Sequence, residues 1–205
     1  NELVATWGNL VNRVVSFTWK NYEGKIPNPG QLRASDLELL ETIKAGFDSV
    51  GDHLEKVQLK SALAEAMRLA TEVNKYLDVH APWFEIKTDR DEAAKSLFTA
   101  IQAIDWLKIL FSPFLPDTSE RLNQILANDY SLFGTSFTQE ITDSLGTHLV
   151  LGRNSDNSLE KVGSDAWIPL DLEAGKPFNQ PTPLFKKLDH SMVEEERSRL
   201  GKPSD

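Results

Sequence analysis

The sequence predicts an all-α fold: an antiparallel bundle of four or five helices followed by a loop-rich C-terminal extension. Three observations support this fold class. Over residues 1–128, apolar residues recur at the 3.6-residue period of a helix. Short Pro- and Gly-containing connections separate these stretches, which favours antiparallel neighbours. Over residues 129–205 the period is lost, and we expect an irregular extension that ends in a short helix.

Length and composition are those of a soluble globular chain. The 205 residues are enough for one core with an appendage, and no run approaches the roughly 18 apolar residues of a membrane span. There are no cysteines, which excludes disulfides and thiolate metal sites and fits a cytoplasmic protein. A net charge of -9 argues against non-specific phosphate binding, so any contact with nucleic acid should be local and specific.

The first helix should run from about Asn1 to Tyr22, and the Gly24–Pro27 region should end it. Its start lacks an initiator Met and already shows a helical pattern, so we expect a fragment of a longer protein. One face carries the apolar series Leu3, Trp7, Leu10, Val14 and Phe17.

Two further helices follow the Pro/Gly connection. Ser35 is a plausible N-cap for the second helix, and Gly51 should weaken or end it. The third should run from about Lys56 to His80, because Pro82 disfavours the helical region for the residue before it.

The fourth helix, around residues 94–111, is apolar on nearly every side and should be the central core helix. Pro113 and Pro116 should break it, and Asp117 or Thr118 can cap a short fifth helix. In the extension, residues 149–151 and 167–170 are either strands of a small hairpin or extended chain. The acidic-then-basic order of residues 191–201 suits a short helix or a frayed, solvated end.

Polar and aromatic residues at two places suggest a binding surface. Asn9 and Arg13 lie one helical turn apart, away from the apolar stripe, and form either a solvated face or a hydrogen-bonding fork. Trp83 follows the end of the third helix, where it either covers the core or offers a stacking surface to a planar ligand such as an unpaired base.

No catalytic or metal site is apparent. The four histidines are dispersed, and none pairs with another at metal-ligand spacing on one helix. The Gly-Lys pairs lack the flanking residues of a phosphate-binding loop. We therefore expect the chain to catalyse nothing on its own.

Four segments, in order, resemble the C-terminal part of the methionyl-tRNA synthetase family. They are GNLVNRV at 8–14, NKYLD at 74–78 with APW at 81–83, PFLPDTSE at 113–120, and PLFKKL at 183–188. The last segment is the most specific to this family, because a related bundle occurs in other class I synthetases. Trp7 departs from the family pattern, since a smaller aliphatic residue is expected there.

The resemblance implies an anticodon-binding bundle of the class I synthetase type that recognises the CAU anticodon loop of methionine tRNA. It implies that Asn9 and Arg13 hydrogen-bond anticodon bases and that Trp83 stacks on an unpaired one. Pro82 and Asp78 lie in the same segment; Asp78 can shape the loop or reject wrong bases by its charge, or simply be solvated near the helix end.

The resemblance also sets expectations for the longer protein. Its catalytic domain would use ATP, and any zinc would belong to that domain, so this fragment should hold neither. The other partner would be that catalytic domain, and we expect a monomer. Two alternatives stay open: the bundle of another class I synthetase, and a helical interaction module with no RNA role.

Overall fold

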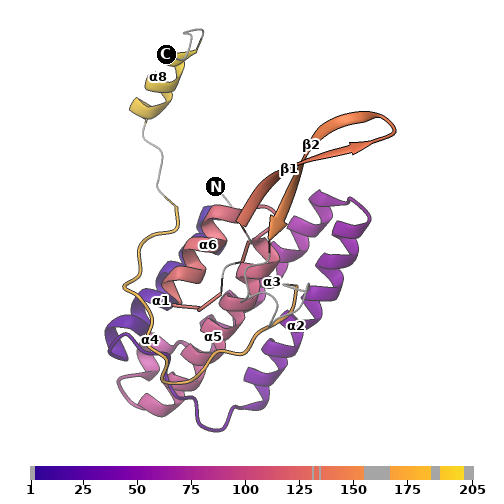
Figure 1. Ribbon diagram of the computed structural model, residues 1–205. Coiled ribbons are helices and arrows are strands. Elements are labelled where there is room, and N and C mark those ends of the chain that lie inside the picture. The colour runs from indigo at the N-terminus through magenta and orange to yellow at the C-terminus, as the bar shows by residue number, and fades with distance from the viewer. Residues whose placement is uncertain (1–2, 131, 134, 155–166, 186–189, 201–205) are drawn as a thin grey trace.

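The computed structural model describes residues 3–130, 132–133, 135–154, 167–185 and 190–200, and helices make up most of it (Figure 1). The predicted all-α fold class is confirmed. The helices are η1 (Val4–Gly8), α1 (Asn9–Asn21), α2 (Ala34–Glu55), α3 (Leu59–His80), α4 (Pro82–Glu85), α5 (Arg90–Phe111), α6 (Pro116–Ile125) and α8 (His190–Arg199). No helix in these described ranges is long and apolar enough to cross a membrane.

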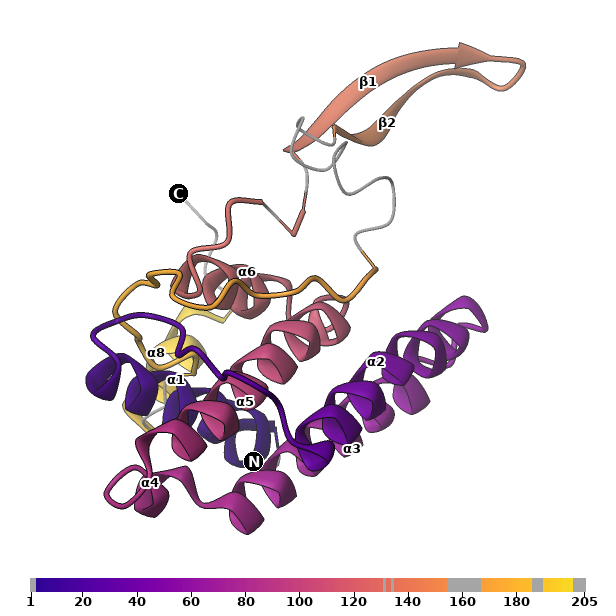
Figure 2. The same ribbon diagram turned by 90° about the horizontal axis from the view of Figure 1, so that it is seen from below.

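Helix α5 is the centre of the bundle, as predicted. It packs against α1, α2, α3, α4 and α6, and Figure 2 shows it running between α1 and the antiparallel pair α2–α3. From Ala93 to Phe111 almost every side chain is buried. Apolar residues lie on all sides of α5, which favours burial of the whole helix, and the other helices therefore pack around it.

One buried cation lies inside this core. The Lys108 ammonium is fully buried and donates to Asp105 Oδ1 at 2.7 Å and to Asn123 Oδ1 at 2.6 Å. Burial lowers the pKa of Lys108, and the Asp105 carboxylate opposes that shift. Because Asn123 belongs to α6, the hydrogen bond between Lys108 and Asn123 connects α6 to α5.

The predicted first helix consists of two kinds of helix. The turn η1 is π-helical and continues into α1. Trp7 is 1% exposed and stacks on Phe111 with ring centroids 4.7 Å apart, so the large residue fills the core. Gly8 leaves room for Phe185, whose Cδ2 would lie 2.6 Å from an added Cβ. Two of the segments quoted above, 8–14 and 183–188, therefore meet here; Lys186, Lys187 and Leu188 lie outside the described residues.

Both predicted boundaries of α2 are wrong. The helix begins at Ala34 with Arg33 as N-cap residue, because the Asp36 carboxylate accepts the Arg33 backbone N–H at 2.8 Å. It also continues through Gly51 to Glu55. An added Cβ at Gly51 would lie 3.2 Å from Trp167 Nε1, which itself donates to the Phe47 carbonyl at 2.8 Å. Gly51 thus gives space to a tryptophan from the extension.

The end of α3 at His80 is as predicted, and the connection after it contains a short helical turn. Ala81 takes a left-handed conformation with φ 40°, and Pro82 then opens the single turn α4. Helix α6 begins at Pro116 with Leu115 as N-cap residue. The predicted caps Asp117 and Thr118 are wrong, since both lie inside the first turn of α6.

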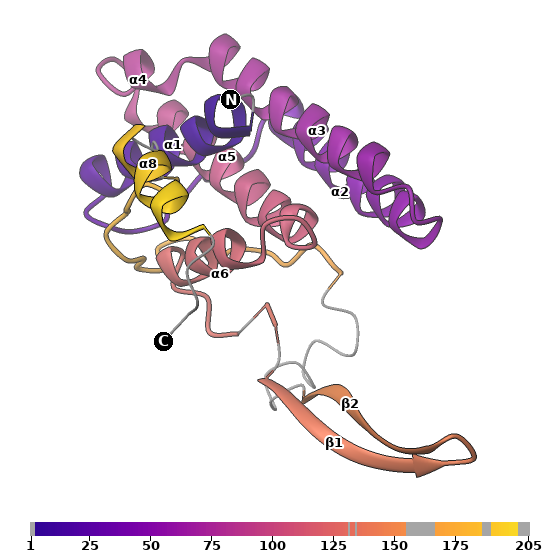
Figure 3. The ribbon, with the colours of Figure 1, turned by 90° about the horizontal axis from the view of Figure 1, so that it is seen from above.

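The extension contains a regular hairpin, so the expectation that it is irregular is wrong there. Strand β1 (Thr135–Asp143) pairs antiparallel with β2 (Gly146–Asn154), with Glu140 opposite Leu149. All three ribbon views show the hairpin projecting away from the bundle (Figures 1, 2 and 3). Of the two apolar runs that the sequence left open, residues 149–151 lie in β2 and residues 167–170 do not pair with them.

Residues 167–185 instead cross the bundle as extended chain. The Leu170 carbonyl accepts from Trp106 Nε1 at 2.6 Å and from Gln102 Nε2 at 2.9 Å. Further along, Arg121 Nη2 donates to the Leu184 carbonyl at 2.5 Å. This segment therefore packs on α5 and α6. The division into residues 1–128 and 129–205 as separate units stays a prediction.

A buried polar network joins α2, α3 and α5. Arg33 Nη2 donates to Asp36 Oδ1 at 2.9 Å, to the Tyr76 hydroxyl at 3.0 Å and to Ser96 Oγ at 2.8 Å. The Tyr76 hydroxyl donates to Asp36 Oδ1 at 2.5 Å. Burial by itself would raise the pKa of Asp36, but the hydrogen bonds from Arg33 and Tyr76 outweigh it and hold this pKa below its ordinary value.

The same network reaches α4. Ser96 Oγ also lies 3.3 Å from Glu85 Oε2, so the last residue of α4 is tied to α5.

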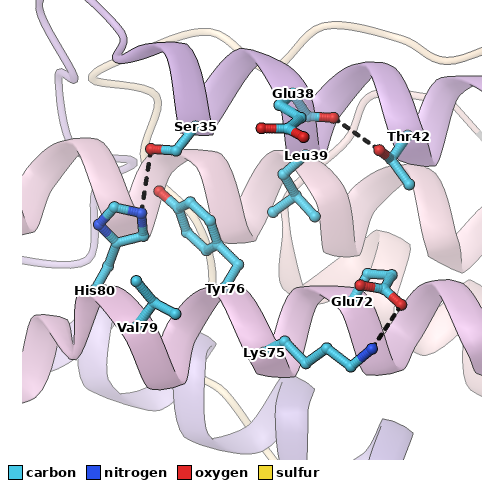
Figure 4. Close-up of a pocket in the computed structure, with 9 residues that line it drawn as sticks. All are labelled: Ser35, Glu38, Leu39, Thr42, Glu72, Lys75, Tyr76, Val79 and His80. Carbon is cyan, nitrogen blue, oxygen red and sulfur yellow. Dashed lines mark hydrogen bonds and ion pairs between the residues drawn. The ribbon is translucent and has the colours of Figure 1, made fainter.

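Beside this network, a groove of about 260 Å³ runs between α2 and α3, and Figure 4 shows Ser35 of α2 facing His80 of α3 across the groove. Ser35 Oγ and His80 Nε2 are 3.2 Å apart. The end of α3, and with it the turn that carries Trp83, is thereby fixed to the start of α2.

The close approach of α2 and α3 makes Gly46→Ala a test of the packing. An added Cβ would lie 2.3 Å from Leu69 Cδ1, so we expect the free energy of unfolding in urea to fall by about 1–3 kcal/mol through overpacking. In a Leu69→Ala background that carbon is gone, and Gly46→Ala should then cost clearly less, with the contact to Leu110 Cδ1 at 3.3 Å remaining. The same cost in both backgrounds would contradict this explanation.

The partial burial of His80 predicts a pH dependence of stability. Burial, followed by the charge of Arg33, lowers the pKa of His80 below its ordinary value of 6.5. As the pH falls below 6.5, the unfolded chain therefore takes up a proton at this site before the folded protein does, and stability is lost.

Urea unfolding of the wild type and of His80→Gln, compared at pH 7.5 and pH 5.5, measures this effect. The wild type should lose more unfolding free energy between the two pH values than His80→Gln loses. Equal losses would mean that the protonation of His80 does not affect folding.

Candidate nucleic-acid interface

Arg13 and Trp83 meet where α1 faces α4. The guanidinium carbon of Arg13 lies 4.5 Å from the centre of the Trp83 ring, a cation–π arrangement. Phe17, one turn further along α1, meets the same ring edge-on at 5.6 Å. Trp83 is half-buried, so α1 supports part of the ring and another part stays accessible.

Asn74 completes this arrangement and was not among the predicted site residues. Its Oδ1 accepts from Arg13 Nη2 at 3.4 Å, while its own amide donates to the Ala70 carbonyl at 3.0 Å. The Arg13 guanidinium is therefore held between an amide and an indole ring. Asn74 stands in the quoted segment 74–78, but its sequence position alone does not show that it reaches α1.

The remaining predicted residues lie around this pair. Asn9 is exposed at the start of α1, one turn before Arg13 and on the same side of the helix. Asp78 is exposed in the last turn of α3, one turn beyond Asn74. Pro82 is buried at the first position of α4, so it can set the direction of the turn but presents little surface of its own.

This constellation can bind a planar polar group rather than transform one. It combines an aromatic surface with guanidinium and amide donors, which is the set that single-stranded RNA recognition uses. If Trp83 were fully buried and far from Arg13, a stacking role would be excluded, and neither is the case. Among the described residues, no group of three or more His, Asp or Glu side chains is placed to hold a metal ion.

Sequence comparisons identify the relatives of this chain. A family model described as the anticodon binding domain of methionyl tRNA ligase matches residues 26–152, which include Asn74 and Trp83 but not Asn9 or Arg13. The methionine–tRNA ligase of Thermomicrobium roseum is 49% identical over 200 residues, covering 98% of this chain and 34% of the relative. That of Chloroflexus aurantiacus is 45% identical over 201 residues, covering 98% and 32%.

Solved structures agree on the fold. The apo form of Mycobacterium tuberculosis methionyl-tRNA synthetase superposes with a TM-score of 0.72 over 92% of this chain and 33% of that one, at 21% sequence identity. The chain spans about a third of the length of the curated relatives it matches. From the family match and the close relatives together, we conclude that this chain belongs to the anticodon-binding domain family of methionyl-tRNA ligase.

Proposed function

We propose that this chain recognises the CAU anticodon of methionine tRNA, as part of a longer methionine–tRNA ligase. The observation that carries the proposal is the Arg13 guanidinium held over the half-buried Trp83 ring, within a domain of this family. The matches to methionine–tRNA ligases support it, whereas neither a helical module without an RNA role nor another class I synthetase receives such support.

Each residue has a defined part in the proposed readout. A base that stacks on the accessible part of Trp83 comes within reach of Arg13, whose guanidinium lies 4.5 Å from that ring. Arg13 then donates to the edges of splayed bases, and the Asn9 amide donates to them or accepts from them. Asn74 holds Arg13 in place, and buried Pro82 sets the direction of Trp83.

Charge favours selective over general binding. The chain carries -9 in total, so it repels phosphates except where cations gather, and affinity must come from base contacts. Asp78 is exposed one turn beyond Asn74, and its carboxylate would repel base edges that present acceptors. The negative surface thereby contributes to specificity.

The longer protein would join methionine to its tRNA with ATP. Its catalytic part, with ATP and any zinc, would lie in the two thirds of the relatives that this chain does not span. That part would be the intramolecular partner of the chain described above, and we propose a monomer.

Replacing Trp83 tests the stacking surface. Trp83→Ala should weaken binding to a CAU anticodon stem-loop by roughly 5- to 150-fold, because stacking of one base contributes about 1–3 kcal/mol. Trp83→Phe should lose less, since it keeps a smaller ring. Fluorescence anisotropy of a labelled stem-loop measures both, and circular dichroism should show the helices intact. An unfolded Trp83→Ala would identify Trp83 as a core residue instead.

The same titration tests base readout by comparing the CAU loop with a loop whose first anticodon base is changed. The wild type should prefer CAU at low and at moderate salt, and Arg13→Ala and Asn9→Ala should lose most of that preference. Equal binding of both loops by the wild type would contradict anticodon recognition by this chain.

A further inference from the structure

The residue after Trp83 is an unexplained exposed aromatic. Phe84 is 70% exposed, although the two residues before it in the same turn are buried or half-buried. The exposed face of the phenyl ring is free to stack on a planar ligand. The turn α4 is also well anchored through Glu85, so Phe84 is held out on a fixed support.

A cation accompanies the ring. Lys87 Nζ lies 6.0 Å from the Phe84 ring centre, and the Lys87 backbone N–H donates to the Phe84 carbonyl at 3.1 Å. That hydrogen bond closes the turn and keeps the two side chains on one side of it. The pair thus offers an aromatic face with a positive charge beside it.

Two neighbouring aromatic residues at this edge also carry a cation. Besides Lys87 and Phe84, Arg13 lies over Trp83, and Arg90 lies 4.6 Å from the Tyr22 ring centre. These pairs come from α1 and its C-cap residue, from α4 and the loop that follows it, and from the start of α5. Three cation–aromatic pairs therefore lie at this edge, with the Glu85 and Asp91 carboxylates near Tyr22 as well. Single-strand binding sites combine these two side-chain types, because bases stack on rings while cations meet the backbone.

We propose that Phe84 and Lys87 form a second stacking platform, for an unpaired RNA nucleotide next to the base held by Trp83. The inference rests on the proposed anticodon recognition and extends it to a further nucleotide of the loop. Successive side chains of a helical turn point about 100° apart, so the two rings face different directions. A splayed strand, whose bases turn outward separately, can place one base on each ring. Lys87 then meets the phosphate of the nucleotide on Phe84.

This platform adds binding affinity without discriminating between bases. A phenyl ring stacks on any base, whereas Arg13 and Asn9 offer directional hydrogen bonds. Loss of Phe84 should therefore weaken the CAU loop and the changed-base loop by the same factor. Loss of Arg13 should weaken the CAU loop more.

Titration of the 205-residue chain with anticodon stem-loops tests the platform. A fluorescent adenine analogue is placed at each unpaired loop position in turn, and wild type, Phe84→Ala, Phe84→Tyr, Lys87→Ala and Trp83→Ala are compared. Phe84→Ala should weaken binding on the order of tenfold for both loops, and Phe84→Tyr should bind as the wild type does. Phe84→Ala should also remove the fluorescence change at one loop position, and Trp83→Ala at a different one.

Val79→Ala is the matched control, because Val79 is a similarly exposed apolar residue, at 79%, on neighbouring α3; it should bind as the wild type does. Wild-type preference for CAU together with unchanged affinity and fluorescence in Phe84→Ala would overturn the second platform and leave anticodon recognition standing. No preference for CAU by the wild type would overturn both. Lys87→Ala should reduce the salt dependence of binding, and an unchanged salt dependence would contradict its phosphate contact.

Discussion

The burial of α5 is the constraint on which the rest of the bundle depends. Its apolar residues occupy every side of the helix, so no orientation of α5 at a surface would satisfy them. Helices α1, α2, α3, α4 and α6 cover it, and the extended residues 167–185 pack alongside. Lys108 is tolerated inside because Asp105, Asn123 and the Tyr130 hydroxyl accept hydrogen bonds from its ammonium group.

The candidate RNA surface depends on this core through two routes. From one side, α1 packs on α5 and carries Asn9 and Arg13 to the edge. From the other, Glu85 is held by Ser96 of α5, and the end of α3 is held at Ser35. Arg13 and Trp83 therefore meet because two separate segments are each fixed to the same scaffold. A binding site held in this way loses little conformational entropy when its ligand arrives.

Local rules predicted the interior of the helices better than their ends. The period of apolar residues located α1, α2, α3, α5 and α6, and Pro82 ended α3 as expected. Arg33 is the N-cap residue of α2 because the buried Asp36 carboxylate accepts a hydrogen bond from its backbone N–H. Gly51 lies inside its helix instead of ending it, and it leaves space there for Trp167, 116 positions later. The cap depends on Arg33 and Asp36, which are three residues apart, whereas the position of Gly51 depends on a partner that is distant in sequence.

For the candidate site, sequence alone determined the residue types and their local spacing. Asn9 and Arg13 share a helix face because helical geometry places residues four apart together, and Trp83 follows a helix end because proline stops the helix before it. Only the tertiary structure decided that Arg13 lies over Trp83, that Asn74 holds it, and that Phe84 stays exposed beside it. These relations join α1, α3 and α4, and they depend on how each packs against α5, which no local pattern encodes.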